Sequence, residues 1–311
     1  MIPVYMINGF LESGKTDFIS FTISQDYFRT GERTLLVLCE EGEQEYEPRL
    51  LKKTNTIVEI IEDEEDFTVD ALSYLAKKDK ASRVIIEYNG MWQHKNIQLP
   101  PDWKLEQQIT LIDASTFPMY YTNMRSMVAD MVRNSEMIIF NRCDGVDTLA
   151  SYKRNIKAVN PKADIIFEGS KGEINMTLEE DLPFDINADV IELDNFGFGV
   201  WYIDIMENEQ RYEGKTISYV GQVLHPKKFP KGYFVPGRMT MACCSEDMAF
   251  MGLATKYDGC DRFPDKSWVN VTATIKNQYF EDYGGVGPVL YAKEVKPCKE
   301  PEKPIIDFTA Q

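Results

Sequence analysis

The sequence predicts an α/β fold, a doubly wound and mainly parallel sheet, followed by a small all-β domain of the OB-like barrel kind. Three observations support this. Short β-rich runs alternate with helical stretches up to about residue 172. The first run is followed by a glycine-bounded turn, GFLESGKT, and then by a helical pattern. After Gly172 most helical periodicity disappears, and strand-like runs separated by Gly and Pro follow.

Seven strands are expected in the first part of the chain, each a short run rich in apolar and β-branched residues. They are Pro3–Asn8, Thr34–Cys39, Thr56–Ile61, Arg83–Tyr88, Gln108–Ile112, Met137–Phe140 and Asp164–Phe167. Apolar residues at helical spacing predict helices at Asp17–Asp26, Asp66–Ala76 and Tyr120–Arg133. We interpret the methionine stripe of the last helix as core rather than as a metal-binding or partner surface.

The second part of the chain carries six expected strands. They are Val190–Leu193, Val200–Ile205, Thr216–Val223, Arg238–Met241, Trp268–Ile275 and Val289–Glu294. The resulting organisation is a nucleotide-binding type of domain at 1–172, a linker at 173–187, a β-rich domain at 188–297 and a tail at 298–311. The tail is charged and rich in proline, so we expect it to be loosely held.

Composition and charge exclude several classes of protein. With 43% hydrophobic residues, the chain of 311 residues is a folded protein rather than a disordered one. A net charge of -16 opposes binding to nucleic acid or to anionic lipid. No apolar run reaches the roughly 18 residues of a membrane span, and no secretion signal opens the chain, so we expect a cytoplasmic protein. The six scattered cysteines favour free thiols or a metal site over disulfides.

The turn after the first strand satisfies the P-loop pattern, with Gly9, Gly14, Lys15 and Thr16 at the required spacing. In a P-loop, backbone N–H groups and a helix N-terminus surround phosphates, the lysine reaches the β and γ groups, and the hydroxyl holds Mg²⁺. The other residues expected at this site are Leu11, Glu12, Ser13 and Asp17. A plain strand–turn–helix would not explain a lysine and a hydroxyl at these places. The fold predicted for residues 1–172 is therefore that of a P-loop NTPase.

A guanine-binding sequence is expected at the end of a later strand, and MIIFNRCD provides one. Asn141 and Asp144 have the required Asn-x-x-Asp spacing, with Arg142 where lysine is usual. The carboxylate would accept hydrogen bonds from guanine N1 and N2. Ser170 and Lys171 then form the loop that closes over the base. Alone, Asn and Asp after a strand are turn residues, but their place in a P-loop chain favours the guanine interpretation.

The hydrolytic side of the site requires an acidic residue at another strand end. RVIIEYNG offers Glu87, which would order Mg²⁺ or the attacking water, and Gly90, where close approach to the γ-phosphate favours glycine. The acidic stretch CEEGEQEYEP lies between. It is either a solvated loop or a metal-gathering switch to which Cys39 adds a soft ligand.

Together these motifs resemble the CobW/HypB/UreG family of P-loop GTPases, which act as metallochaperones and cofactor-insertion factors. The resemblance spans about residues 2–172 and rests on GFLESGKT, CEEGE, the E-x-x-G sequence beginning at Glu87, TLIDAS and NRCD. It implies Glu40 and Glu43 as switch carboxylates, and Thr16, Glu40, Glu43 and Glu87 as ligands of Mg²⁺ or of a transferred metal. Lys15 and Glu87 are then the catalytic residues.

Two features depart from the family pattern. Glu12 replaces a usual glycine of the P-loop. The Cys-x-Cys-Cys motif of the zinc-handling branch is missing, since no second thiol lies between Cys39 and Glu87, and this weakens the case for zinc delivery by that route.

The C-terminal half resembles the soluble domain of accessory subunits that accompany a family of bacterial permeases. The resemblance rests on GQVLHP, YFVPGRMTMACCSEDM and WVNVTATI. Cys243, Cys244 and Asp247 lie in this stretch and either form a second metal site or are buried, inert residues. Adjacent cysteines on a regular strand face opposite sides, so joint chelation requires a bulge or a turn.

Three functions are compatible with these motifs. The first is a slow GTPase, stimulated by a partner or a metal, that uses GTP, GDP and Mg²⁺, with Zn²⁺ or another transition metal as cargo. Its partners would be a client metalloprotein or a permease subunit, and it would form a homodimer. The second is a non-hydrolysing nucleotide-binding adaptor of a membrane permease. The third is a P-loop small-molecule kinase, which would leave Asn141 and Asp144 unexplained.

Overall fold

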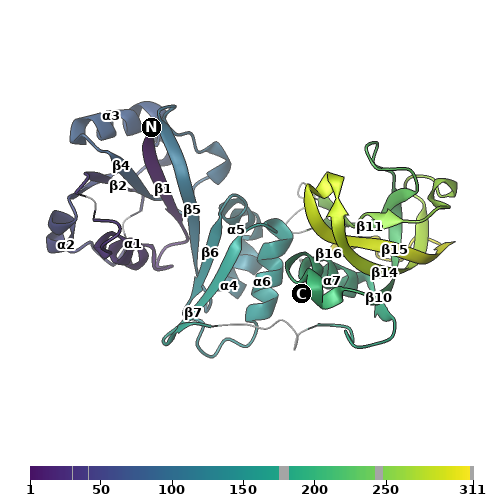
Figure 1. Cartoon of the computed structure of the whole chain (residues 1–311). Coiled ribbons are helices and arrows are strands. Elements are labelled where there is room, and N and C mark those ends of the chain that lie inside the picture. Colours follow the sequence, from purple (N-terminus) through teal and green to yellow (C-terminus); the bar gives the residue numbers. More distant parts are fainter. Residues whose placement is uncertain (30, 41, 175–181, 242–247, 309–311) are drawn as a thin grey trace. The chain divides into compact units, whose positions relative to one another are not determined.

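The computed structural model describes residues 1–29, 31–40, 42–174, 182–241 and 248–308. The chain divides into two compact units, Met1–Asn175 and Met176–Gln311 (Figure 1). Within the described ranges, no helix combines the length and the apolar character needed to cross a membrane.

The first unit is a sheet with helices on both faces. Its strands are β1 (Ile2–Asn8), β2 (Thr34–Leu38), β3 (Thr56–Ile60), β4 (Arg83–Glu87), β5 (Trp103–Asp113), β6 (Met137–Asn141), β7 (Asp164–Gly169) and β8 (Gly172–Glu173). Its helices are α1 (Lys15–Ser24), α2 (Pro48–Lys53), α3 (Val69–Asp79), α4 (Phe117–Asn123), α5 (Arg125–Val132) and α6 (Leu149–Val159). The predicted doubly wound architecture is confirmed.

The sheet has the order β3-β2-β4-β1-β5-β6-β7-β8. Every neighbouring pair from β3 to β7 is parallel, and only β8 runs antiparallel to β7. The carboxyl ends of β1, β4, β5 and β6 therefore meet at one edge, where ligands of open parallel sheets bind. This edge carries the loops with GFLESGKT, Glu87, TLIDAS and NRCD.

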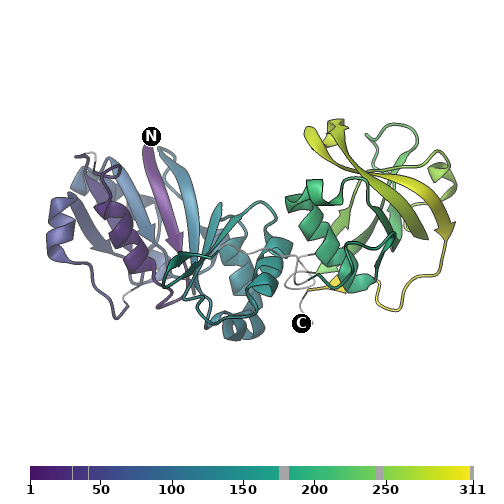
Figure 2. The same ribbon diagram turned by 60° about the horizontal axis from the view of Figure 1, so that its bottom comes forward.

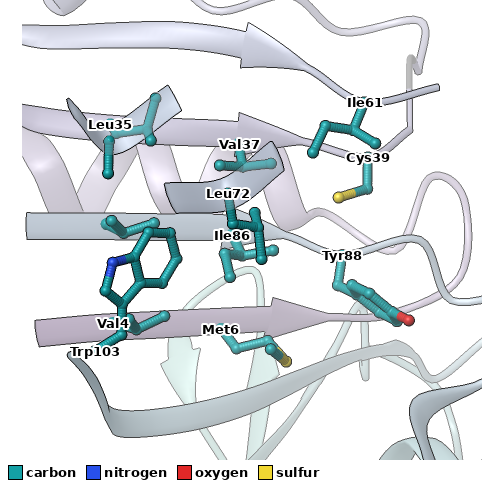
Figure 3. Packing of buried hydrophobic residues seen from close by; sticks show 12 residues of the cluster. Val4, Met6, Leu35, Val37, Cys39, Ile61, Leu72, Ile86, Tyr88 and Trp103 are labelled. Carbon is teal, nitrogen blue, oxygen red and sulfur yellow. The ribbon is translucent and has the colours of Figure 1, made fainter. Parts of the chain in front are cut away.

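The two faces of the sheet bury separate apolar clusters. On one face, Leu72 of α3 packs against Val4, Val37 and Ile86 of three adjacent strands (Figure 3). On the other face, which α1 covers (Figure 2), Ile19 and other α1 residues pack against the strands. Residues that alternate along one strand feed both clusters, which fixes the register of the sheet.

The helix expected at Tyr120–Arg133 is two helices. α4 ends at Asn123 and α5 begins at Arg125, because Met124 leaves helical geometry with φ -133° and ψ 36°. The expected stripe is nonetheless core where it meets the sheet, since Val128 and Met131 are buried. Apolar spacing predicted which face is buried, but it contains no signal for a one-residue break.

The second unit is built mainly of strands. They are β9 (Ile191–Leu193), β10 (Thr216–Leu224), β11 (Tyr233–Met241), β12 (Met248–Gly252), β13 (Thr255–Lys256), β14 (Trp268–Phe280), β15 (Gly285–Pro297) and β16 (Ile305–Asp307). The described part of this unit also contains the α-helix α7 (Asn195–Glu207). Pairings run from β10 to β11, β13, β15, β14 and back to β10, with the β13–β15 pair parallel. This ring closes a five-stranded barrel of the predicted OB-like kind.

The strand expected at Val200–Ile205 is wrong, because these residues lie inside α7. Asp194 caps the helix by accepting a hydrogen bond from the Gly197 N–H at 2.6 Å. Val200, Ile203 and Ile205 are all buried, so the helix is apolar almost all round. An apolar run without a polar face has no periodicity that separates a buried strand from a buried helix.

The tail also differs from the expectation of a loosely held segment. Ile305–Asp307 forms β16, which pairs in parallel with β11. Ile306 and Phe308 are buried, and Phe308 lies so close to Gly199 of α7 that a Cβ there would come within 2.8 Å of its ring. Two apolar anchors hold this segment although its composition is polar.

Candidate nucleotide site

The loop between β1 and α1 has backbone geometry that only certain residues adopt without strain. Gly9 and Gly14 have φ of 150° and 92°, and Glu12, at 59°, is a non-glycine residue in the left-handed region. A Cβ on Gly9 would lie 2.5 Å from the Leu111 carbonyl oxygen. Glycine is thus required at both ends, and α1 starts directly at Lys15 with its N-terminal N–H groups facing the loop, as an anion site requires.

Lys15 is enclosed in this loop. Its side chain is 4% exposed, and its Nζ donates to the carbonyl oxygens of Gly9 (2.8 Å) and Phe10 (2.9 Å). The third partner is the Glu40 carboxylate, with Nζ to Oε2 at 2.8 Å. The lysine that the sequence assigns to phosphate is therefore held in place by the loop and neutralised by an acidic residue.

Thr16 and Glu87 are brought together as the motif predicts. The Thr16 hydroxyl donates to Glu87 Oε1 at 3.0 Å, and the Tyr46 hydroxyl donates to Oε2. Glu87 is the last residue of β4 and is 3% exposed. Burial raises the pKa of its carboxyl, although the hydrogen bonds and Lys15 act in the opposite direction.

Of the other expected metal ligands, Glu40 lines the same pocket as Thr16 and Glu87. Glu40 is bound to Lys15, and Glu43 is exposed, with its backbone N–H donating to Glu12 Oε1 at 3.0 Å. Across the described ranges, no group of three or more His, Cys, Asp or Glu side chains is arranged to hold a metal ion.

The guanine-type motif is tied to the phosphate loop. Asn141, at the end of β6, donates from Nδ2 to the Ser13 carbonyl oxygen at 2.7 Å. Arg142 donates from Nη1 to the Glu12 carbonyl oxygen at 2.9 Å and pairs with Asp113 Oδ2 at 2.6 Å. These contacts fix the distance between the two halves of the site.

Asp144 faces the loop after β7. One of its oxygens accepts the Ser170 N–H at 2.7 Å, and the other accepts the Ser170 hydroxyl at 3.2 Å. A Cβ on Gly169 would lie 2.8 Å from the carboxylate, so glycine permits this approach. Lys171 follows in the same loop and is exposed. The structure brings Asp144 and Ser170 together at the open edge of the sheet.

Three residues of the site received no role from sequence reasoning. Sequence patterns assign no role to Tyr46, which lies in an acidic stretch, or to Asp113, which belongs to TLIDAS. Asn8 is fully buried next to the loop, and neither its amide oxygen nor its amide nitrogen has a partner. A polar residue at a strand end is the signal that could have indicated Asp113 and Asn8.

Gly90 approaches the phosphate loop itself. A Cβ there would lie 2.5 Å from the Gly9 carbonyl oxygen and 2.9 Å from the Phe10 nitrogen. The absence of a side chain at this position is explained by backbone packing within the protein.

Cys39 is a core residue in this structure and not the soft metal ligand that the sequence allowed. Its sulfur lies among buried residues that include Val37 and Ile61 (Figure 3). Burial first and Glu87 second raise the pKa of its thiol far above the ordinary value, which opposes formation of the thiolate that binds metals. Cys243, Cys244 and Asp247 lie outside the described residues.

Comparison with known proteins gives two family matches. Residues 3–167, more than half of the chain, match the model of the CobW/HypB/UreG nucleotide-binding domain. Residues 170–306 match the DUF1980 C-terminal domain. No curated protein matches the chain.

Several solved structures are similar at low identity. The Zn(II)-bound YjiA GTPase from E. coli is 19% identical, with a TM-score of 0.43, over 72% of this chain and 73% of that one. The hydrogenase maturation factor HypB from Archaeoglobus fulgidus is 16% identical, with a TM-score of 0.38, over 55% and 82%. HypB from Helicobacter pylori in complex with nickel is 17% identical, with a TM-score of 0.35, over 55% and 80%. At such identities the similarity concerns the fold alone.

Proposed function

Because the chain belongs to the CobW/HypB/UreG family, as its motifs predict, we propose that it binds guanine nucleotides and hydrolyses GTP. The observation that carries this proposal is the hydrogen bond from Asn141 to the carbonyl oxygen of Ser13. It joins the strand end that reads the base to the loop that holds phosphate. A bare P-loop accommodates many nucleotides, whereas this connection supports the assignment of Asp144 to guanine.

Each residue of the site has a part in binding. The N–H groups of the Gly9–Gly14 loop and the ammonium of Lys15 hold the phosphates. Asp144 accepts hydrogen bonds from the guanine ring, and Ser170 and Lys171 cover it. The hydroxyl of buried Ser13 has no partner, but it lies against Gly9 and is not part of the pocket around Lys15.

Thr16 and Glu87 would hold Mg²⁺ directly or through its water shell, since hydroxyl and carboxylate oxygens suit this ion. When bound, Mg²⁺ neutralises charge that develops between the β- and γ-phosphates. We propose that Glu87, at the end of β4, also orients an attacking water. We therefore expect GTP hydrolysis to depend on Thr16 and Glu87.

The proposed role of hydrolysis is regulatory. Glu40 and Glu43 lie in a segment that contacts the phosphate loop, so GTP and GDP states can differ in how this segment is held. We propose that this difference controls delivery of a metal or metallocofactor to a client metalloprotein or permease subunit, with homodimerisation or the client completing a slow active site. We place this activity in the cytoplasm.

A titration of GTP against ATP tests the nucleotide preference. It is performed with Mg²⁺, and then with Zn²⁺, Co²⁺ or Ni²⁺, on the wild type, Asp144→Ala and the control Asp147→Ala, which removes an exposed carboxylate three residues away. Loss of hydrogen bonds to a charged group should weaken GTP binding about 10- to 100-fold without changing ATP binding. An unchanged GTP preference in Asp144→Ala would contradict the proposal.

One observation favours a second function. Lys15 is neutralised by Glu40 within the chain itself, which also suits an adaptor of a membrane permease that binds nucleotide without turnover. Tight GTP binding with no phosphate release, even with Mg²⁺ and the client present, would support the adaptor. Measurable turnover that Glu87→Ala abolishes would support the GTPase.

A further inference from the structure

A short stretch after β2 lies over the phosphate side of the site. This capping segment consists of Glu40 and residues 42–46, and four of its residues contact the phosphate-binding half. The contacts are Glu40 with Lys15, the Glu43 N–H with Glu12, Gln44 with Asp17, and Tyr46 with Glu87. All four contact residues outside the segment belong to the P-loop, the first turn of α1 or the end of β4.

The Glu40 carboxylate is bound to the Lys15 ammonium, which is the positive charge that a phosphate would require. Lys15 and Glu40 are 4% and 12% exposed, so solvent screens their attraction only weakly. Lys15 Nζ already donates to two carbonyl oxygens and one carboxylate oxygen, which uses the three donors of an ammonium group. A phosphate oxygen can bind this ammonium only where another acceptor leaves.

The Tyr46 contact occupies the second half of the site. Its hydroxyl donates to Glu87 Oε2, while Thr16 donates to Oε1. Each oxygen of the carboxylate therefore has a protein donor before any cation approaches. A cation at Glu87 must compete with the Tyr46 donor.

The space between the capping segment and Lys15 is small, although a cavity of about 270 Å³ lies farther along the segment, next to Thr16 and Tyr46. The pocket bounded by Gly14, Lys15, Glu40, Gln44 and Glu87 has a free volume of about 20 Å³. This holds about one water molecule and is too small for a diphosphate. Gly42 also passes close to the P-loop, since a Cβ there would lie 3.0 Å from Glu12 Oε1.

We propose that the capping segment is a latch that a nucleotide must open. The phosphate takes the place of the Glu40 carboxylate on Lys15, and a divalent cation takes the place of the Tyr46 hydroxyl on Glu87. The two exchanges release the segment from the P-loop, so its position depends on whether the phosphate site is filled. This inference rests on the proposed function of guanine-nucleotide binding.

Binding of GDP in EDTA isolates the first exchange, because no cation is then present for Glu40 to bind. The protein is compared with Glu40→Gln and with Glu45→Gln, which removes an exposed carboxylate from the same segment. Glu40→Gln should bind GDP about tenfold more tightly, and Glu45→Gln should bind like the wild type. A structural role for Glu40 would lower the thermal midpoint without tightening GDP binding.

The second exchange is tested by Mg²⁺ titration of the GDP complex. Tyr46→Phe removes only the donor to Glu87, and exposed Tyr74→Phe is the control. Tyr46→Phe should reach half-saturation at about three- to tenfold lower Mg²⁺, while Tyr74→Phe should require the same Mg²⁺ concentration as the wild type. A higher Mg²⁺ requirement would mean that Tyr46 assists the cation, and would overturn this half of the latch.

The outcomes separate the latch from the proposed function. Normal GDP binding by the wild type together with unchanged or weaker binding by Glu40→Gln would refute the latch alone. Failure of the wild type and of Glu40→Gln to bind any guanine nucleotide, with or without Mg²⁺, would refute the proposed function and the latch with it.

Discussion

Two buried charged residues of the barrel unit contrast with the polar residues at the sheet edge of the nucleotide unit. In the barrel unit, Asp204 and Arg238 are almost completely buried, and each is surrounded by partners from the chain. Asp204 accepts hydrogen bonds from Asn208, Arg211 and Tyr212. Arg238 donates to Asn195 and to the carbonyl oxygens of residues 220, 303 and 304.

In the nucleotide unit, several buried groups at the edge of the sheet lack a partner. They are both amide atoms of Asn8, the Ser13 hydroxyl and the Asn141 amide oxygen. A buried polar group without a partner costs free energy, so its persistence calls for an explanation. Single unpaired atoms also occur in the barrel unit, at Trp201 Nε1 and Asn277 Oδ1. What distinguishes the sheet edge is that four such atoms gather in three residues around the phosphate loop, where a ligand is expected.

The largest effect should follow from removal of Arg238. Arg238→Ala deletes the donors to Asn195 and to two carbonyl oxygens of the tail, and it should destabilise the barrel unit by about 3–4 kcal/mol. Denaturant unfolding measures this, and hydrogen exchange at Ile306 should rise as the tail is released. Arg262→Ala, an exposed arginine of the same unit, is the control. A loss below about 1 kcal/mol would show that these buried bonds do not stabilise the unit.

A buried histidine of the nucleotide unit should give the next largest effect. Burial lowers the pKa of His94 to about 4, against the hydrogen bond from Nδ1 to the Trp92 carbonyl. Below about pH 6.5 the unfolded chain therefore binds a proton at His94 that the folded chain does not bind. The free energy of unfolding falls as the pH drops from there towards 4. Over that pH range the free energy of unfolding of His94→Phe should fall by about 2 kcal/mol less than that of the wild type. Urea unfolding at several pH values measures this difference. Parallel pH curves would contradict this.

A smaller effect of opposite sign is expected at Ser13. Its buried hydroxyl has no partner, so Ser13→Ala should leave the ligand-free protein equally stable or about 1 kcal/mol more stable. The same change should leave GDP binding within about threefold of the wild type, because the hydroxyl lies against Gly9 and outside the pocket around Lys15. Thermal unfolding and GDP titration measure the two quantities, with exposed Ser126→Ala as control. A loss of GDP affinity above about tenfold would mean that the hydroxyl contacts the phosphate.

The smallest effect should come from Arg142→Lys, which restores the residue usual in the family pattern. The Arg142–Asp113 pair is 49% and 15% exposed, so solvent screening limits its value to well under about 1 kcal/mol. Lysine can still reach the Glu12 carbonyl oxygen. GTP affinity should change less than about threefold. A change above tenfold would mean that the planar guanidinium itself contacts the nucleotide.

Much of the site could be predicted from the sequence because its residues lie close together along the chain or at the ends of predicted strands. Gly9, Gly14, Lys15 and Thr16 lie in one turn, and the strand ends that carry Glu87 and Asn141 follow from alternating strands and helices. Contacts between residues far apart in the sequence could not be predicted from it. The Tyr46–Glu87 and Arg142–Glu12 bonds join segments 41 and 130 residues apart, and nothing in either segment specifies the other.

The same distinction explains the errors in the fold. The pattern of Val200–Ile205 predicts a strand because burial on every side removes helical periodicity. The composition of the tail predicts a loosely held segment because its two apolar anchors are outnumbered by charged neighbours. Each depends on which surface covers the segment.

The sequence by itself determined the strand–helix alternation, the phosphate loop and the order of the motifs along one sheet edge, because backbone sterics and hydrophobic periodicity act over a few residues. Only the tertiary structure decided that Lys15 is held by Glu40, that Glu87 is held by Tyr46, and that Cys39 is buried in the core. Those outcomes depend on the distances between segments that the packed sheet brings together, and burial then sets the strength of each charge and hydrogen bond.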